Sequence, residues 1–486
     1  MSEFESGAAT PASLENASPD GGKKAELDGG VSFDLLISLC KRRGFVFPGS
    51  EIYGGINALY DFGPLGVRLR RNIRQSWWNR MVERRGDIEP IETAIIMNRE
   101  VWVASGHVGS FSDPLVECAA CHRRWREDHL EDERRARGKT GAGCPECDGT
   151  LGESRKFNLM FRTFLGPVQD DLNEVFLRPE TAQGQFVNFA NILNSTRHSL
   201  PFGIAQTGKS FRNEISPGNF IFRSREFEQM EMEWFCEPGS DREWFEYWCD
   251  DRFAWYVDEL GVRSARLRLR PHTREELSHY SAGTSDVEYL FPFGWGELEG
   301  IADRTDFDLG AHQQHSGKDL TYFDPATNRR FLPYVIETAV GVDRTLLVTL
   351  MDAYDEEEVR GEKRVLLRFH PAIAPFQLAI LPLSKKPELT GLSLSLVERL
   401  RSRWSVDFDQ TQSIGRRYRR QDEIGTPLAI TVDFESLQDH AVTIRNRDTM
   451  AQVRVSIDRL EVAIGEQLAE AAQRVLARAR GELPVN

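Results

Sequence analysis

The chain has 486 residues, of which 40% are hydrophobic and 28% are charged, and its formal net charge is −14. This length accommodates two to four domains of roughly 100–200 residues each, and the composition is that of an ordinary globular protein. The acidic balance argues against a general nucleic-acid binder, so we expect no DNA partner. The sequence holds no run of about 18 apolar residues, so we expect no membrane span and no membrane partner.

The first segment, residues 1–30, is polar, rich in small residues and poor in aromatic residues. Because such a stretch buries too little apolar surface to fold, we expect a disordered tail there. The tail lacks the charged-then-apolar pattern of a secretory signal. A cytoplasmic protein is the simplest interpretation.

Helical and strand patterns alternate through residues 31–351. Residues 31–43 repeat apolar side chains at helical spacing, and residues 65–83 predict a long amphipathic helix followed by a strand around Pro90. Residues 175–235 alternate Gly and Pro turns with aromatic and β-branched runs, which predicts antiparallel strands. The other expected elements are a helix at 243–261, strands at 287–293 and 297–300, and a strand that becomes a helix near Gly341 within 334–351.

A different pattern follows the acidic stretch at residues 352–364. Strands are expected at 378–383, 428–432, 442–448 and 451–456, with helices at 388–404 and 457–478. Strands that alternate with helices indicate a separate α/β domain. We place the boundary near residues 362–367, so that a unit at 31–362 precedes a mixed α/β domain at 363–486.

Four of the seven cysteines form two close pairs, Cys118 with Cys121 and Cys144 with Cys147, and 22 residues separate the pairs. This spacing is typical of a tetrahedral four-cysteine zinc site, which leaves no open ligand position and is therefore structural. The alternatives are four reduced cysteines or two disulfides, and a cytoplasmic location disfavours disulfides. The isolated cysteines are expected in the core: Cys40, Cys236 and Cys249.

Residues 211–231 predict two strands that carry arginines, carboxylates and an aromatic ring. The guanidinium groups of Arg212 and Arg223 suit phosphate, because each presents a planar bidentate fork. Phe227 offers a ring to a purine, and Glu231 offers a carboxylate to an ammonium group. The alternative is a hairpin with cross-strand salt bridges that add little stability.

Residues 334–344 form a second such segment. A strand delivers Glu337, Gly341 permits a close backbone approach, and Arg344 opens a helix from which it can reach a terminal phosphate. The alternative is a capped helix start with a surface arginine.

The two segments resemble motifs 2 and 3 of the class II aminoacyl-tRNA synthetases, and residues 65–90 resemble motif 1, which builds the dimer interface in that class. Within the class, six segments resemble the glycyl-tRNA synthetase family, in the family's order from about Phe33 to the terminal helix. They are YDFGPLG (60–66), ASGHVGSFSDP (104–114), FNLMF (157–161), LRPETAQG (177–184), GIAQTGKSFRNEISPGNF (203–220) and FEQMEMEWF (227–235). The resemblance implies an α+β fold: a class II antiparallel sheet with flanking helices, a zinc-bearing insertion at 115–155, and a C-terminal mixed α/β anticodon-binding domain.

The resemblance also implies an ATP site that uses Mg²⁺. By analogy, Arg212 binds the α-phosphate, Arg223 holds the bent triphosphate, Phe227 stacks on adenine, Arg344 meets the γ-phosphate, and Glu297 lies near the metal. Arg212, Arg344 and Glu297 are the expected catalytic residues. The expected ATP-binding residues are Arg212, Asn213, Glu214, Phe222, Arg223, Phe227, Glu297, Leu298, Gly341 and Arg344.

The implied glycine pocket is acidic and contains Glu180, Glu231 and Glu337, with Arg126 as a further substrate residue. Three carboxylates around one ammonium group repel one another until the cation binds. Glycine has no side chain to grip, so rejection of alanine must be largely steric. The chain departs from the family at residues 338–339, where Thr-Ala replaces the usual Pro-Ser and removes a hydroxyl that helps to position glycine.

The expected activity is ATP-dependent ligation of glycine to the 3′ end of tRNA(Gly) through a glycyl-adenylate, by a homodimer. Two alternatives stay open: a prolyl or threonyl enzyme of the same class, and a non-catalytic synthetase-like protein that only binds nucleic acid or a partner. Six C-terminal arginines indicate either a solvated helix face or a tRNA-facing surface: Arg401, Arg403, Arg416, Arg417, Arg419 and Arg420.

Overall fold

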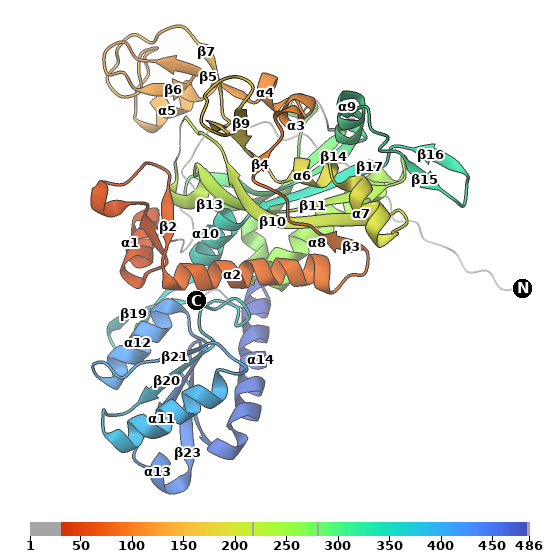
Figure 1. The fold of residues 1–486 in the computed structure, drawn as a ribbon. Coiled ribbons are helices and arrows are strands. Elements are labelled where there is room, and N and C mark those ends of the chain that lie inside the picture. The colour runs from red at the N-terminus through yellow and green to blue at the C-terminus, as the bar shows by residue number, and fades with distance from the viewer. Residues whose placement is uncertain (1–30, 216–217, 279–280, 484–486) are drawn as a thin grey trace, which may run out of the picture.

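The computed structural model describes residues 31–215, 218–278 and 281–483. Figure 1 shows a larger unit built on a central sheet and a smaller C-terminal unit below it, with the long last helix reaching back toward the larger one. The tail expected at 1–30 lies outside the described residues.

The N-terminal part of the chain forms a helix, a small hairpin and a long helix. Ser32 caps the first helix by accepting a 3.3 Å hydrogen bond from the backbone N of Leu35, and Gly44 ends it with φ at 77°. The helix expected at 65–83 is regular to Trp78 and then makes one π-helical turn. The elements are α1 (Phe33–Arg43), β1 (Val46–Pro48), η1 (Glu51–Tyr53), β2 (Tyr60–Phe62), α2 (Pro64–Trp78) and η2 (Asn79–Glu83).

The larger unit is organised by a seven-stranded sheet in the order β12–β13–β14–β17–β11–β10–β3. All neighbouring strands are antiparallel except β3 and β10, which are parallel. The predicted antiparallel sheet with flanking helices is therefore confirmed. The strands are β3 (Ile88–Pro90), β10 (Phe202–Phe211), β11 (Glu226–Cys236), β12 (Leu267–Pro271), β13 (Gly283–Phe291), β14 (Gly294–Thr305) and β17 (Tyr334–Gly341).

The alternation of side chains along β11 separates the core from the opposite face of the sheet. Met230, Met232 and Trp234 enter the main apolar core, which α2, α8 and α10 cover. Because successive residues of a strand point to opposite faces, Glu231 and Glu233 point away from that core. On their side α6 and α9 contact the sheet and α7 joins its apolar cluster. The helices are α6 (Ala182–Phe186), α7 (Phe189–Thr196), α8 (Asp241–Asp258), α9 (Phe307–Ser316) and α10 (Val342–Ala353).

The cysteine-bearing insertion is a small lobe with its own three-stranded sheet, β6–β5–β7, and its own apolar cluster around Val116, Trp125 and Leu130. It lies at the end of the larger unit that is remote from the C-terminal unit (Figure 1). The elements of this part are β4 (Ile96–Met97), α3 (Arg99–Ala104), α4 (His107–Ser110), β5 (Ser112–Glu117), β6 (Arg124–Arg126), η3 (Glu127–His129), α5 (Leu130–Ala136), β7 (Arg155–Asn158), β8 (Arg162–Phe164) and β9 (Glu174–Leu177).

The C-terminal unit contains a five-stranded mixed sheet in the order β21–β20–β22–β23–β24. The first three strands are parallel and the last two pairings are antiparallel, so the predicted mixed α/β unit is confirmed. Its elements are β20 (Leu378–Pro382), α11 (Pro387–Leu400), β21 (Val406–Phe408), α12 (Ile414–Ile424), β22 (Leu428–Val432), α13 (Ser436–Asp439), β23 (Ala441–Asn446), β24 (Gln452–Ser456), η6 (Ile457–Arg459) and α14 (Leu460–Ala479).

The boundary predicted at 362–367 coincides with a strand, β19 (Glu362–Leu367), which pairs with β18 (Tyr354–Val359). This hairpin connects the two units. The remaining elements are η4 (Phe220–Phe222), η5 (Ser264–Arg266), β15 (Tyr322–Asp324) and β16 (Arg329–Phe331). Among the described residues, no helix has the length and apolar character needed to cross a membrane.

The sequence left two alternatives for six C-terminal arginines, a solvated helix face or a tRNA-facing surface, and neither holds for Arg417. Its side chain is buried and donates hydrogen bonds to the backbone oxygens of Pro382 at 2.6 Å and Asp409 at 3.1 Å. The guanidinium lies in the interior beside the end of β20, where it satisfies backbone acceptors. Arg401, Arg403 and Arg416 are exposed.

Candidate active site

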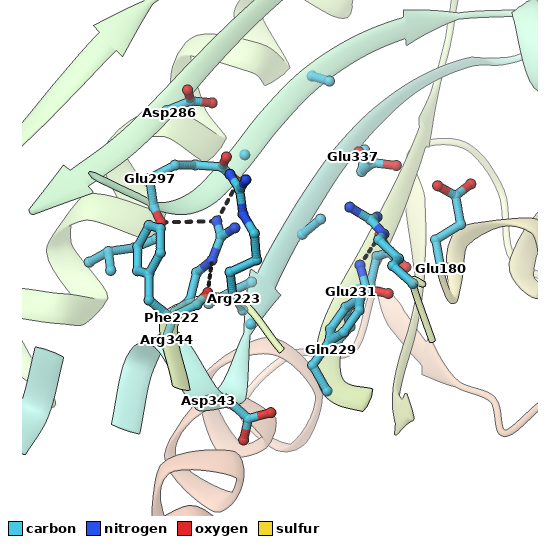
Figure 2. Close-up of a pocket in the computed structure, with 18 of the residues that line it drawn as sticks. Glu180, Phe222, Arg223, Gln229, Glu231, Asp286, Glu297, Glu337, Asp343 and Arg344 are labelled. Atoms are coloured by element: carbon cyan, nitrogen blue, oxygen red, sulfur yellow. Dashed lines mark hydrogen bonds and ion pairs between the residues drawn. The ribbon is translucent and has the colours of Figure 1, made fainter. Parts of the chain in front are cut away.

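A cavity of about 290 Å³ opens on the face of the central sheet that carries Glu231. Strands β11, β14 and β17, the turn η4 and the start of α10 supply its walls. Twelve of the residues predicted for ATP or glycine line it: Glu180, Arg212, Glu214, Phe222, Arg223, Phe227, Glu231, Glu297, Leu298, Glu337, Gly341 and Arg344. Of the residues labelled in Figure 2, Phe222, Arg223 and Glu297 lie near Arg344, whereas Glu180, Gln229 and Glu337 lie near Glu231.

Strand pairing brings these residues together from distant parts of the sequence. In the register of β11 and β17, Glu231 lies opposite Ala339 and Glu233 lies opposite Glu337. Glu231 is also opposite Gln206 on β10. The carboxylates of Glu231 and Glu337 therefore lie on one face of neighbouring strands, because residues two apart on a strand share a face.

One end of the cavity is built around Arg344. Its guanidinium forms a 3.0 Å ion pair with Glu297 and donates to the backbone oxygens of Phe222 at 3.1 Å and Glu297 at 3.0 Å (Figure 2). The guanidinium carbon lies 4.6 Å from the centroid of the Phe222 ring. The charge of Arg344 lowers the pKa of Glu297, so this carboxylate is ionised at neutral pH. A planar cation beside a ring and an ionised carboxylate suit a nucleotide with its metal-bound phosphates.

Arg212 lies between two aromatic rings. Its guanidinium carbon is 5.4 Å from the ring centroids of both Phe227 and Phe111, and its Nε donates to the backbone oxygen of Pro179 at 3.0 Å. Arg212 and Phe227, which are in contact, were both expected to bind ATP. Arg212 is thus held by one hydrogen bond and two rings, with the rest of its fork available to a ligand.

The other end of the cavity is acidic, and each carboxylate has its own partner. Glu180 forms a 3.3 Å ion pair with His107, and Glu337 accepts a 2.9 Å bond from Arg304. Glu231 accepts a short hydrogen bond from the hydroxyl of Thr181 and one of 3.3 Å from the amide of Gln229. Each of these carboxylates accepts only some of the hydrogen bonds that its two oxygens can take. The remaining lone pairs can accept bonds from an ammonium group.

Burial and mutual repulsion set the charge of this acidic cluster. Burial opposes ionisation of Glu180, but the charge and hydrogen bond of His107 outweigh it and hold the pKa of Glu180 below its usual range. Burial raises the pKa of Glu231 to about 8, and the charges of Glu337 and Glu180 add to this rise. Burial likewise raises the pKa of Glu337 to about 7, although Arg304 opposes it. Glu231 and Glu337 therefore retain part of their protons at neutral pH.

Several residues of the site were missed in the sequence: His107, Thr181, Gln229, Arg304 and Asp308. His107 and Thr181 lie in segments that resemble the family, at 104–114 and 177–184. Their place in these segments could have marked them as site residues. Arg304 lies near the end of β14 and donates hydrogen bonds to Glu337 and Asp308. No local sequence pattern identifies it as a site residue. Its partners are contributed by β17 and α9.

Two predicted residues do not line the cavity. Arg126, at the end of β6, forms ion pairs with Asp113 at 2.9 Å and Asp128 at 2.7 Å. Asn213 is adjacent to Arg212, and its backbone N donates to the oxygen of Leu159 at 2.7 Å. Arg126 belongs to the sheet of the insertion, outside the cavity lining.

The four paired cysteines converge in the insertion. The Sγ atoms of Cys118 and Cys147 are 3.5 Å apart, those of Cys121 and Cys144 are 3.7 Å apart, and all four lie within 4.8 Å of one another. Four thiolates at Zn–S bonds of about 2.3 Å stand about 3.8 Å apart in a tetrahedron, so this arrangement fits zinc. All seven cysteines are free thiols, and the three isolated ones are buried, as predicted.

Two family models match the chain. The model described as tRNA synthetase class II core domain (G, H, P, S and T) matches residues 164–353, and the model described as anticodon binding domain matches residues 377–467. Glycine–tRNA ligases align with nearly the whole folded chain. Those of Cutibacterium acnes, Thermobifida fusca and Acetivibrio thermocellus are 56%, 54% and 54% identical to it. The alignments cover 90%, 90% and 88% of this chain and 96%, 98% and 97% of the relatives.

The chain belongs to the glycine–tRNA ligase family. The class II core model spans β10, β11, β14 and β17, and so contains both ends of the cavity. The anticodon model spans the five-stranded C-terminal sheet. Membership of this family counts against the prolyl, threonyl and non-catalytic alternatives left open by the sequence.

Proposed function

We propose that this chain ligates glycine to the 3′ end of tRNA(Gly) with ATP, through a glycyl-adenylate. One observation carries this proposal: a single cavity joins an arginine cluster at one end to a carboxylate cluster at the other. The first suits a nucleotide triphosphate and the second suits an ammonium group. A glycine carboxylate held between them faces the α-phosphate.

In the proposed first step, an oxygen of the glycine carboxylate attacks the α-phosphorus of ATP, and pyrophosphate leaves. Arg212, Arg223 and Arg344 stabilise the charge that moves onto the phosphates, from positions fixed before ATP binds. Glu297 is the carboxylate that would hold Mg²⁺ with ATP, and the metal, when bound, neutralises phosphate charge. Phe222, at the end of η4, and Phe227, on β11, offer rings to adenine within the cavity.

In the proposed second step, a hydroxyl of the terminal ribose of tRNA attacks the adenylate carbonyl, and AMP leaves. The chemistry needs no nucleophilic side chain, because the adenylate is already an activated acyl group. Glu180, Glu231 and Glu337 hold the ammonium group through both steps. Ala339 lines the cavity where the family usually has serine, so the proposed glycine contacts rest on the three carboxylates.

The four cysteines are proposed to bind one structural Zn²⁺ within the insertion at 115–155. The proposed domains are a catalytic unit at 31–362 and an anticodon-binding unit at 363–486, whose exposed Arg401, Arg403 and Arg416 offer contacts to tRNA phosphates. A cytoplasmic location stays a prediction.

A homodimer is proposed, because residues 65–90 resemble motif 1, which builds the dimer interface in that class, and the segment before this region exposes apolar side chains. Ile52, Tyr53 and Ile56, just before α2, are 88%, 87% and 56% exposed. Contiguous large apolar side chains that face solvent are typical of protein–protein interfaces. The oligomeric state of the purified chain checks this proposal.

ATP–pyrophosphate exchange with glycine, alanine, serine and proline tests the proposed substrate. We expect exchange with glycine, and exchange with alanine and serine lower by at least roughly tenfold, since rejection of larger side chains is expected to be steric. Exchange supported by proline and not by glycine refutes the assignment.

A further inference from the structure

A fourth carboxylate, Glu233, lies behind the glycine end of the cavity and has no role in the proposed mechanism. It is 0% exposed, and neither of its carboxylate oxygens has a hydrogen-bond partner among the described residues. It shares the site face of β11 with Glu231, two residues before it. A buried carboxylate without a donor is rare, because an unpaired buried charge is very costly.

The groups that face Glu233 come from four elements. Glu231 precedes it on β11, Glu337 lies opposite it on β17, Asp308 approaches from α9, and Arg304 approaches from the end of β14. The residue opposite it on β10 is Ile204, which is apolar. Glu180 does not belong to this group, but its negative charge acts on Glu231.

Arg304 is bonded to other carboxylates in this cluster. It donates to Asp308 at 2.7 and 2.9 Å and to Glu337 at 2.9 Å, but makes no hydrogen bond to Glu233. Four carboxylates thus share Arg304, with weaker attraction of Glu337 to Arg212 and of Glu231 to Arg178, and ionising all four leaves an excess of negative charge in a buried region. A proton on one carboxylate removes that excess, as in other carboxylate pairs that share a proton.

The positions of the carboxylates identify where such a proton is shared. Glu231, Glu233 and Glu337 each place one carboxylate oxygen within 4.8 Å of the other two. Residues directly opposite on antiparallel strands are in side-chain contact, so Glu337 is the acceptor that Glu233 reaches most directly. Glu231 already accepts one hydrogen bond on each oxygen, from Thr181 and Gln229, whereas Glu337 accepts a bond from Arg304 on one oxygen only.

We propose that Glu233 is a positioning residue that remains a neutral carboxylic acid and donates its hydroxyl to Glu337, which holds the Glu337 carboxylate toward the ammonium group of glycine. Burial raises the pKa of Glu233 well above its usual range, and the charges of Glu337 and Glu231 add to the rise, which agrees with the neutral form. The inference rests on the proposed glycine site, of which Glu337 is a member.

Two substitutions of Glu233 in the full-length chain separate the neutral form from the charged form. Glu233→Gln keeps a neutral donor of nearly the same shape, and Glu233→Leu removes the donor. We expect Glu233→Leu to raise the KM for glycine by roughly tenfold in ATP–pyrophosphate exchange, the loss of one hydrogen bond to a charged group. The KM for ATP should stay the same, and Glu233→Gln should restore the KM for glycine to within about threefold of the starting value.

The pattern of results decides between the possibilities. If Glu233→Gln impairs glycine binding as much as Glu233→Leu, the charged carboxylate is needed and the proposal is wrong. If Glu233→Leu leaves the KM for glycine unchanged, Glu233 does not position Glu337 and the proposal is equally wrong. Circular dichroism of both variants shows whether either has lost its fold. If Glu233→Leu does not fold, the KM for glycine of Glu233→Gln decides: a value within about threefold of the starting value supports the proposal, and a larger rise contradicts it.

A control distinguishes this inference from the proposed glycine site itself. Glu231→Gln removes a carboxylate assigned to the ammonium group, and a raised KM for glycine is expected. If Glu231→Gln and Glu233→Leu both leave this KM unchanged, the glycine site is assigned wrongly. If only Glu233→Leu has no effect, the site stands and the role of Glu233 is refuted.

Discussion

Arg304 donates a 2.9 Å hydrogen bond to Glu337, and the same guanidinium makes two bonds to Asp308. A side chain at the end of β14 thereby fixes the orientation of a carboxylate on β17 and ties both to α9. The glycine end of the cavity depends on this bridge, because Glu337 needs an opposing charge to be ionised while buried.

Arg304→Met tests the bridge. The substitution keeps an unbranched side chain but leaves the buried Asp308 and the partly buried Glu337 without their cation. Breaking a buried ion pair in this way typically costs about 3–5 kcal/mol. We expect a loss of that order in the free energy of unfolding, measured by urea denaturation, with Arg242→Met on the exposed face of α8 as the control. A loss no greater than that of the control contradicts the prediction.

Arg344→Ala is expected to abolish adenylate formation without unfolding the chain. Arg344 is partly exposed at the cavity, and its loss removes charge stabilisation from the transition state rather than a core contact. Removal of one such group typically lowers the rate by about 10²–10³-fold. ATP–pyrophosphate exchange measures the rate, and thermal unfolding checks that the fold is retained. Exchange within a few-fold of the unmodified chain shows that the motif 3 assignment is wrong.

The KM for glycine should depend on pH, because Glu231 and Glu337 have pKa values of about 8 and about 7 in the free enzyme. Below these values the carboxylates gain protons and lose attraction for the ammonium group. We expect the KM for glycine to rise roughly tenfold from pH 8 to pH 6, whereas the KM for ATP changes less. Calorimetry in two buffers should detect proton release when glycine binds at pH 7. A KM for glycine that is flat over this range refutes the prediction.

The same two groups make the free enzyme less stable as the pH rises. Folding raises both pKa values above the ordinary 4.5, so the stability they contribute is complete below pH 4.5 and is lost as the pH passes through about 7 and about 8. Glu231→Gln removes one of these titrations. Its unfolding temperature, relative to that of the unmodified chain, should therefore increase between pH 5 and pH 8, and an unchanged difference counts against the raised pKa.

Purified protein is expected to contain one equivalent of zinc per chain, measured by elemental analysis. Cys144→Ser removes one of four ligands and should lower the zinc content and loosen the insertion, since a structural zinc site contributes directly to folding. The matched control is Cys249→Ser, a buried cysteine outside the cluster that should retain zinc. Much less than one equivalent in the unmodified chain counts heavily against a zinc site.

The sequence alone predicted the class of fold and most of the cavity lining. Arg212, Phe227 and Glu231 were predicted because they lie in one continuous segment, from the end of β10 into β11, that resembles motif 2 of the class II synthetases. The same holds for Glu337, Gly341 and Arg344, where a strand passes directly into a helix. The cysteine pairs were predictable because ligand spacing within each pair is set by one tight turn.

Only the tertiary structure placed the residues that depend on contacts between distant segments. Arg304 and Glu233 acquire their surroundings from strands and a helix far away in sequence, and Arg417 is buried because the end of β20 presents acceptors to it. Local patterns specify which side of a strand or helix a residue takes. The electrostatic environment of a buried charge depends on which strands become neighbours, and that is decided when the sheet assembles.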